Sequence, residues 1–95
     1  MEKRELYLDK IRAEIDQYSA KLAGMHGKAN EVQADIKLDY LKQVKKLEGK
    51  RDNLKEKYEQ LSKSSESSWK DMKDETEIAW NELKIAVSKA TDHFR

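Results

Sequence analysis

The chain has 95 residues, enough for one domain on the usual scale of roughly 100 to 200 residues and too few for a multidomain enzyme. Charged residues make up 41% and hydrophobic residues 37%, with no proline or cysteine, a composition that is typical of long amphipathic helices and argues against β-sandwich and α/β folds. The formal net charge of +1 provides no strong field to attract nucleic acid or an anionic membrane.

The first predicted element is a long helix over about 3–62. Apolar residues recur there at alternating spacings of three and four, with a mean near the 3.5-residue period of a left-handed coiled coil. The alternation slips once, where Ile36, Tyr40 and Val44 follow one another at spacings of four. The stripe consists of Leu8, Ile11, Ile15, Tyr18, Leu22, Met25, Ala29, Val32, Ile36, Tyr40, Val44, Leu47, Arg51, Leu54, Tyr58 and Leu61.

Two glycines three residues apart offer an alternative to the continuous helix. Gly24 and Gly27 favour a turn at 24–30, which would give a monomeric, spectrin-like three-helix bundle. The stripe keeps its helical phase from Leu22 to Val32, however, and a turn has no reason to preserve that phase. The pattern therefore favours one continuous helix, with the bundle as the alternative.

The second predicted element is a helix over about 68–94, after a serine-rich turn at 62–68. Ser67 or Ser68 is suited to cap it, because a serine hydroxyl can accept a hydrogen bond from a free backbone N–H in the first turn. The apolar face of this helix carries Trp69 and Trp80, which we expect to act as core anchors.

The two helix lengths predict a dimer. At 1.5 Å per residue the first helix would be roughly 90 Å long and the second roughly 40 Å, so a hairpin within one chain would leave half of the stripe uncovered. We expect a second copy to cover it, with antiparallel long helices and three-helix-bundle ends in a homodimer. The candidate interface residues are Leu8, Ile11, Ile15, Tyr18, Leu22 and Met25.

Residue patterns for catalysis or ligand binding are missing from the sequence. His26 and His93 have no second ligand at metal spacing, and no glycine-rich phosphate loop is present. A short basic run of lysines at 42–50 is diluted by acidic neighbours and has no interleaved aromatic residues, which argues against nucleic-acid binding. The sequence predicts no catalytic, cofactor-binding or metal residues, no small-molecule substrate, and no enzymatic activity.

Two isoleucines point to a surface for a protein partner. Ile78 and Ile85 are seven residues apart, on the face of the second helix opposite its apolar stripe. The sequence therefore predicts a single helical domain that acts as a coiled-coil structural or protein-interaction module, whose partner it does not name. The alternative is an amphipathic protein that binds lipid surfaces. Without an apolar leader or a membrane-spanning run, a cytoplasmic location is expected.

Four segments carry a resemblance to a known group of proteins. They are MEKRELY at 1–7, ADIKLDY at 34–40, SWKDMK at 68–73 and AWNEL at 79–83. With these segments the chain resembles small, functionally uncharacterised bacterial coiled-coil proteins that have apolipoprotein-like helix repeats. The resemblance implies a bacterial helical protein and supplies no catalytic or ligand residues.

Overall fold

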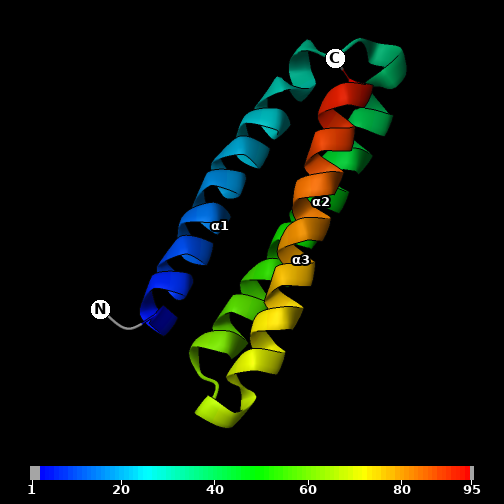
Figure 1. The fold of residues 1–95 in the computed structure, drawn as a ribbon. Coiled ribbons are helices and arrows are strands. Elements are labelled where there is room, and N and C mark those ends of the chain that lie inside the picture. Colours follow the sequence, from blue (N-terminus) through cyan, green and yellow to red (C-terminus); the bar gives the residue numbers. More distant parts are fainter. Residues whose placement is uncertain (1–2, 95) are drawn as a thin grey trace.

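The computed structural model describes residues 3–94, which form an elongated bundle of three α-helices (Figure 1). Helix α1 spans Lys3–Gly27, α2 spans Ala34–Ser62 and α3 spans Glu66–His93, and a short 3-10 helix, η1, covers Lys28–Glu31. Consecutive helices run antiparallel, and the body measures 51 × 21 × 18 Å. The prediction of an all-α fold is confirmed.

The predicted continuous helix over 3–62 is wrong, because the chain reverses direction at 28–33. After η1, Val32 and Gln33 take extended backbone conformations, with ψ of 141° and 144°, and α2 begins at Ala34. The chain is therefore a three-helix bundle, as in the alternative interpretation, with its reversal slightly later than the proposed turn at 24–30.

The position of the reversal explains why helical phase persists across the glycines. Gly24 and Gly27 both lie within α1, and no glycine has a positive φ. The 3-10 turn that follows keeps Ala29 buried and Val32 half-buried on the same side as Leu22. The stripe therefore stays in phase up to the turn, and the slip at residues 36–44 occurs where a new helix has started.

The core is formed by one apolar stripe from each helix of the same chain. Its main cluster joins residues from all three helices, and a smaller cluster of Ala29, Tyr40 and Val44 closes the end near η1. The main cluster consists of Ile11, Ile15, Leu22, Leu47, Leu54, Ala79, Leu83, Val87 and Ala90.

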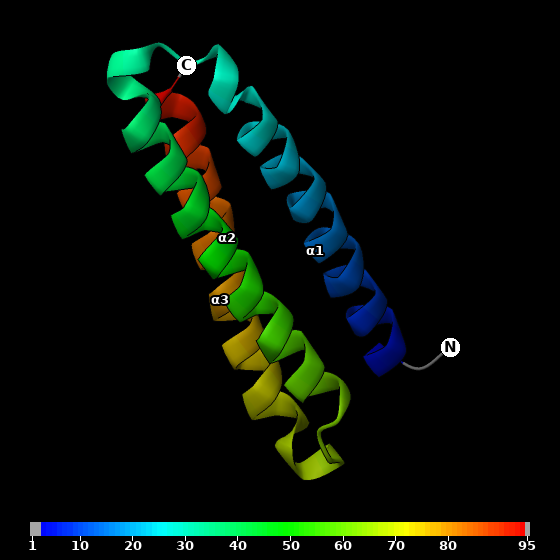
Figure 2. The ribbon, with the colours of Figure 1, turned by 180° about the vertical axis from the view of Figure 1, so that it is seen from behind.

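The residues predicted to form a dimer interface lie inside this bundle. Ile11, Ile15 and Leu22 are buried, and the other three are half-buried. Because the reversal brings α1 back along α2 and α3, the chain covers its own stripe (Figure 2). The homodimer was expected because half of the stripe would be uncovered. That reason no longer applies, and the homodimer remains a prediction. The other three residues are Leu8, Tyr18 and Met25.

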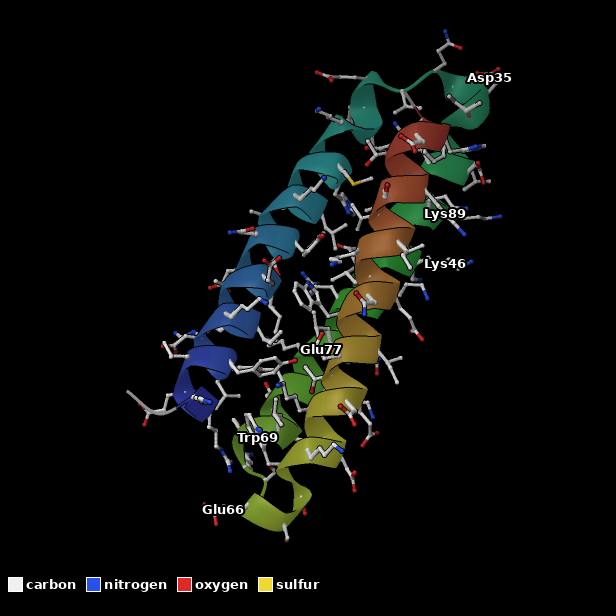
Figure 3. The ribbon with its side chains drawn as sticks, viewed as in Figure 1. Asp35, Lys46, Glu66, Trp69, Glu77 and Lys89 are labelled. Carbon is white, nitrogen blue, oxygen red and sulfur yellow. The ribbon has the colours of Figure 1, made fainter. Side chains whose placement is uncertain are left out.

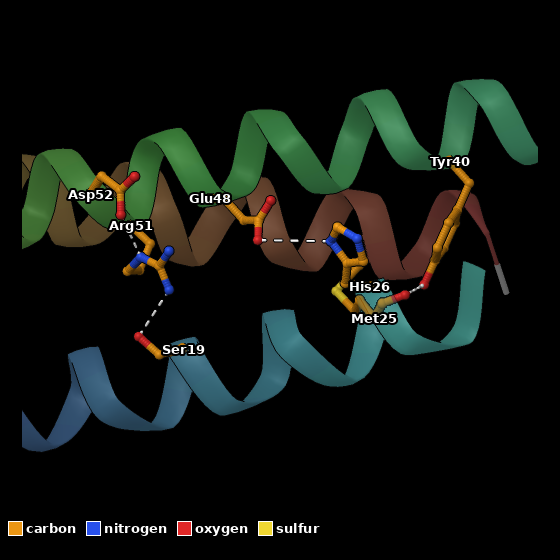
Figure 4. Close-up of polar contacts among 7 residues, drawn as sticks. All are labelled: Ser19, Met25, His26, Tyr40, Glu48, Arg51 and Asp52. Atoms are coloured by element: carbon orange, nitrogen blue, oxygen red, sulfur yellow. Dashed lines mark hydrogen bonds and ion pairs between the residues drawn. The ribbon is translucent and has the colours of Figure 1, made fainter. Parts of the chain in front are cut away.

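Polar contacts fix the position of α1 along α2 (Figure 4). The Tyr40 hydroxyl donates a hydrogen bond to the carbonyl oxygen of Met25 at 2.6 Å. About three turns further along α2, the Arg51 guanidinium donates to the hydroxyl of Ser19 at 3.1 Å. Arg51 occupies a position in the apolar stripe, where its long side chain reaches across the helix pair to a polar partner.

Aromatic side chains fill the space between α1 and α3. The Tyr7 hydroxyl donates to Glu77 at 2.8 Å, and the Tyr7 ring meets Trp69 edge-on at 6.0 Å between centroids. The ammonium groups of Lys10 and Lys84 lie over the Trp80 ring, 5.1 and 4.4 Å from its centroid. Both tryptophans are half-buried, so they bridge helices at the edge of the core.

The turn between α2 and α3 is tighter than the predicted segment at 62–68. The α3 helix begins at Glu66, and Ser65 is its N-cap residue. Ser65 makes no side-chain capping bond, and its hydroxyl contacts those of Ser67 and Ser68 at 3.0 and 3.1 Å. The expected cap at Ser67 or Ser68 is therefore wrong, because both serines already belong to the first turn of the helix.

Candidate functional site

A groove runs along the outer edge between α2 and α3, on the side away from α1. Its volume is about 600 Å³, within the usual range for small-molecule sites, and it is open to solvent. Figure 3 shows the labelled Lys46 and Lys89 side chains on this side of the bundle. The groove is lined by Gln43, Lys46, Leu47, Lys50, Glu82, Ile85, Ala86, Lys89, Ala90, His93 and Phe94.

The groove has an apolar floor and basic walls. Leu47 and Ala90, both buried, form part of the floor, and the exposed side chain of Ile85 extends the apolar surface towards solvent. Lys46, Lys50 and Lys89 line the walls, with Glu82 as the carboxylate among the lining residues. The side chains around the groove therefore carry an excess of positive charge.

Contacts between a basic and an acidic side chain connect α2 and α3 at both ends of this edge. Lys57 contacts Glu75 at 3.1 Å near the α2–α3 turn, and His93 lies 3.8 Å from Asp39 near the other end. The four contacts within 4 Å between basic and acidic side chains among residues 3–94, two of which involve a histidine, do not include the three groove lysines. The middle of the edge therefore lacks the contacts between basic and acidic side chains that its ends have.

The structure places the predicted partner patch on the exposed face of α3. Ile78 is 59% exposed and Ile85 is 56% exposed, but only Ile85 lines the groove. The sequence interpretation did not identify the groove lysines as one cluster. Lys46 and Lys50 belong to the basic run at 42–50, but Lys89 joins them only because α3 folds back along α2.

Two further contacts join titratable side chains of different helices. His26 lies 3.9 Å from Glu48, and no group of three or more His, Cys, Asp or Glu side chains that could hold a metal ion occurs within residues 3–94. Burial raises the pKa of the Tyr7 hydroxyl well above its ordinary value, and its hydrogen bond to Glu77 acts in the same direction. These contacts hold helices together and form no cluster that points into a cavity.

Hydropathy along the three helices bears on membrane insertion. Within residues 3–94, none of the helices combines the length and the apolar character that spanning a bilayer requires.

Comparison with known proteins identifies the family. Residues 4–95 match the DegT/DnrJ/EryC1/StrS aminotransferase family. The chain belongs to this family. No curated protein and no solved structure matches the chain.

Membership of this family corrects three predictions. The resemblance to apolipoprotein-like bacterial coiled-coil proteins is wrong, because the family match covers almost the whole chain. The assignment as a non-catalytic interaction module, with its lipid-binding alternative, is wrong for the same reason, as is the expectation of no enzymatic activity. Helical periodicity reports how side chains pack, and a packing pattern alone does not distinguish an interaction module from a helical part of an enzyme.

Proposed function

We propose that this chain provides a helical part of an aminotransferase, and that the groups which react with the amino donor lie outside the bundle. The family match over residues 4–95 carries the proposal. The architecture is consistent with it, since a rigid three-helix body can support a site formed elsewhere.

The chemistry of the family calls for pyridoxal phosphate, and the described residues do not fit that cofactor. Such a site needs a lysine amine that joins the cofactor and a charged side chain beside its ring nitrogen. A lysine that acts as a nucleophile must be shielded from water, because desolvation favours its neutral form. Among residues 3–94 every lysine is exposed or half-buried, and the groove that gathers three of them is open.

An amino-transfer assay tests the proposal in two preparations. One is the isolated 95-residue chain, and the other is the native protein or complex that contains it, purified through a tag on the chain. Both receive pyridoxal phosphate, glutamate and a panel of keto acceptors, and the formation of 2-oxoglutarate is measured. We expect cofactor-dependent activity in the native preparation and none in the isolated chain. Activity in the isolated chain, or in neither preparation, would contradict the proposal.

Chemical trapping locates the lysine that joins the cofactor. Both preparations are incubated with pyridoxal phosphate and reduced with borohydride, and the labelled peptides are identified by mass spectrometry. In the isolated chain we expect only sparse labelling spread over many surface lysines. Stoichiometric labelling of one lysine within residues 3–94 would mean that the reacting amine belongs to the bundle.

A cytoplasmic location goes with this proposal. Amino donors such as glutamate and their keto-acid products are abundant metabolites of the cytoplasm, where the enzyme would meet them. Cell fractionation followed by immunoblotting tests the location, and recovery of the chain mainly outside the cytoplasmic fraction would contradict it.

A further inference from the structure

We propose that two copies of this chain associate through the outer face of α3, with their α3 helices antiparallel about a two-fold axis. In that arrangement Ile78 of each copy contacts Ile85 of the other, at the mouth of the α2–α3 groove. The α1 residues predicted from the sequence as a dimer interface lie inside the bundle and take no part. This association concerns α3 and its groove only and does not depend on amino transfer.

The residues that would meet the second copy share one side of α3. With 3.6 residues per turn, they fall within roughly 60° of one another around the helix axis. All four are exposed, and the two isoleucines bring apolar surface into contact with water. Association of two such faces would remove that apolar surface from water, which is favourable. The four residues are Asp74, Ile78, Ile85 and Lys89.

The spacing of these four residues is the same from either end of the set, with the charges reversed. Asp74 precedes Ile78 by four residues, and Lys89 follows Ile85 by four residues. A two-fold axis between the isoleucines therefore places Ile78 against Ile85 of the second copy. It also places Asp74 against Lys89 of the second copy. A parallel pairing would instead place each charged residue against its own copy, so the charges favour the antiparallel arrangement.

The charges at the centre of this face also balance in the dimer. Glu82 lies about midway between the two isoleucines, and in the register of α2 and α3 it lies opposite Lys50. Among residues 3–94 these two side chains form no ion pair within 4 Å. At the two-fold axis each copy would contribute one ammonium and one carboxylate group. Lys50 of each copy would then offset the repulsion between the two Glu82 side chains.

The groove beside Ile85 provides room for side chains of the second copy. Its volume is about 600 Å³, its floor is apolar, and Lys46 lies on its wall. In the antiparallel arrangement the second copy's Asp74 would come within about one helical turn of Lys46 along the bundle axis. Such an interface is small and its ion pairs are exposed, so we expect a weak dimer in which the isoleucines supply affinity and the charges set orientation.

Sedimentation velocity on the full chain tests the association at concentrations from about 10 µM to about 2 mM. We expect a reversible equilibrium between monomer and dimer within that range. The double variant Ile78→Lys with Ile85→Lys should weaken dimerisation at least about tenfold. Leu6→Lys is the matched control, because Leu6 is 54% exposed on α1, away from the groove, and it should dimerise as wild type does.

A chain that stays monomeric over the whole range would overturn the proposal. Equal dimerisation of wild type and the double isoleucine variant would also overturn it. Binding of an acidic amphipathic peptide in the groove of a chain that stays monomeric would assign the groove to another protein and would likewise contradict self-association.

Charge reversal tests the antiparallel arrangement directly. Asp74→Lys and Lys89→Asp should each weaken dimerisation about tenfold, because each places like charges against one another at both ends of the interface. An equimolar mixture of the two single variants should form a mixed dimer, because every 74–89 pair across that interface joins opposite charges.

Circular dichroism confirms that each variant is folded, and sedimentation velocity measures association in the mixture. If the mixture associates no more tightly than either variant alone, the antiparallel two-fold arrangement is wrong.

Discussion

Single side chains of this bundle differ greatly in how much they contribute to its free energy of unfolding, and burial is the main reason. Leu83 is completely buried at the centre of the main cluster, whereas Ile85, two residues later on α3, is 56% exposed. The two residues have side chains of the same size on the same helix. A comparison of the two therefore shows how burial affects stability when the size of the side chain stays the same.

Leu83→Ala should lower the free energy of unfolding by about 2–5 kcal/mol, because it removes apolar contacts and leaves a cavity that the helices fill only in part. Ile85→Ala should change the free energy of unfolding by no more than about 0.5 kcal/mol. Urea denaturation followed by circular dichroism measures both values. A similar loss in the two variants would contradict the assignment of Leu83 to the core and Ile85 to the surface.

Tyrosine burial makes the fold sensitive to alkaline pH. Burial raises the pKa of Tyr7, Tyr18 and Tyr40, with Glu77, Glu14 and Glu31 respectively adding to the effect. Below the ordinary tyrosine value near 10, both the folded and the unfolded chain keep these protons. Above it the unfolded chain loses its protons first, so the free energy of unfolding should fall as pH increases.

Tyr7→Phe should make this alkaline decrease shallower, because the variant has one buried hydroxyl fewer to ionise. Denaturation curves recorded between neutral pH and pH above 10 give the slope for wild type and variant. Glu77→Gln serves as the control, since it keeps the tyrosine but removes the carboxylate that accepts its hydrogen bond, and we expect an intermediate slope. A slope for Tyr7→Phe equal to that of wild type would contradict the prediction.

At the scale of single elements, the helical positions were largely predictable from the sequence, whereas the reversal between α1 and α2 was predicted only in the alternative interpretation, with a turn at 24–30. The apolar spacing identifies the buried positions of α1, α2 and α3, because a side chain every three or four residues must face the core whichever neighbour covers it. The reversal at 28–33 contains no glycine and no proline, so it lacks the usual local signals. Tertiary packing of Tyr40 and Phe94 against this end of the bundle provides the missing information.

The glycines of α1 weaken the helix without shaping it. An added Cβ at Gly24 or at Gly49 would meet no atom within 4 Å, and neither residue has a positive φ. Gly24→Ala should therefore increase the free energy of unfolding by up to about 1 kcal/mol, and Gly49→Ala in the middle of α2 should act similarly. Thermal and urea denaturation measure both. A loss of stability confined to Gly24→Ala would show that the backbone near the reversal needs glycine.

The candidate site was only partly predictable for a related reason. The sequence shows the basic run at 42–50 and the exposed isoleucines of α3, but these features lie far apart along the chain. Only the register between α2 and α3 brings Lys46 beside Ile85 and Lys89. Family membership was not predictable from helical periodicity, since periodicity records burial and not chemistry.

At the scale of the whole molecule, the reversal brings residues near positions 4 and 64 together. The Arg4 guanidinium donates to the carbonyl oxygen of Ser64 at 2.6 Å and also lies over the Trp69 ring, 4.6 Å from its centroid. In one continuous helix over 3–62, the same ends would be roughly 90 Å apart. The distance between residues near positions 4 and 64 therefore distinguishes the three-helix bundle from the continuous helix.

Spin labels at Lys3→Cys and Lys63→Cys should report a short distance within one chain by pulsed electron paramagnetic resonance. The sequence has no other cysteine, so the labels are specific. Dilution with excess unlabelled protein removes distances between chains, which an antiparallel dimer of long helices would also make short. We expect the short distance to persist on dilution. Its replacement by a distance near that of an extended helix would restore the continuous-helix architecture.

The odd number of helices has a mechanical consequence. Antiparallel helices return the chain to its starting end when their number is even, whereas three helices leave Lys3 and Phe94 at opposite ends of a body 51 Å long (Figure 1). Polypeptide joined to both ends would be held apart by that length. Within a larger enzyme, the length of the bundle would then set the distance between the parts of the protein joined to its two ends.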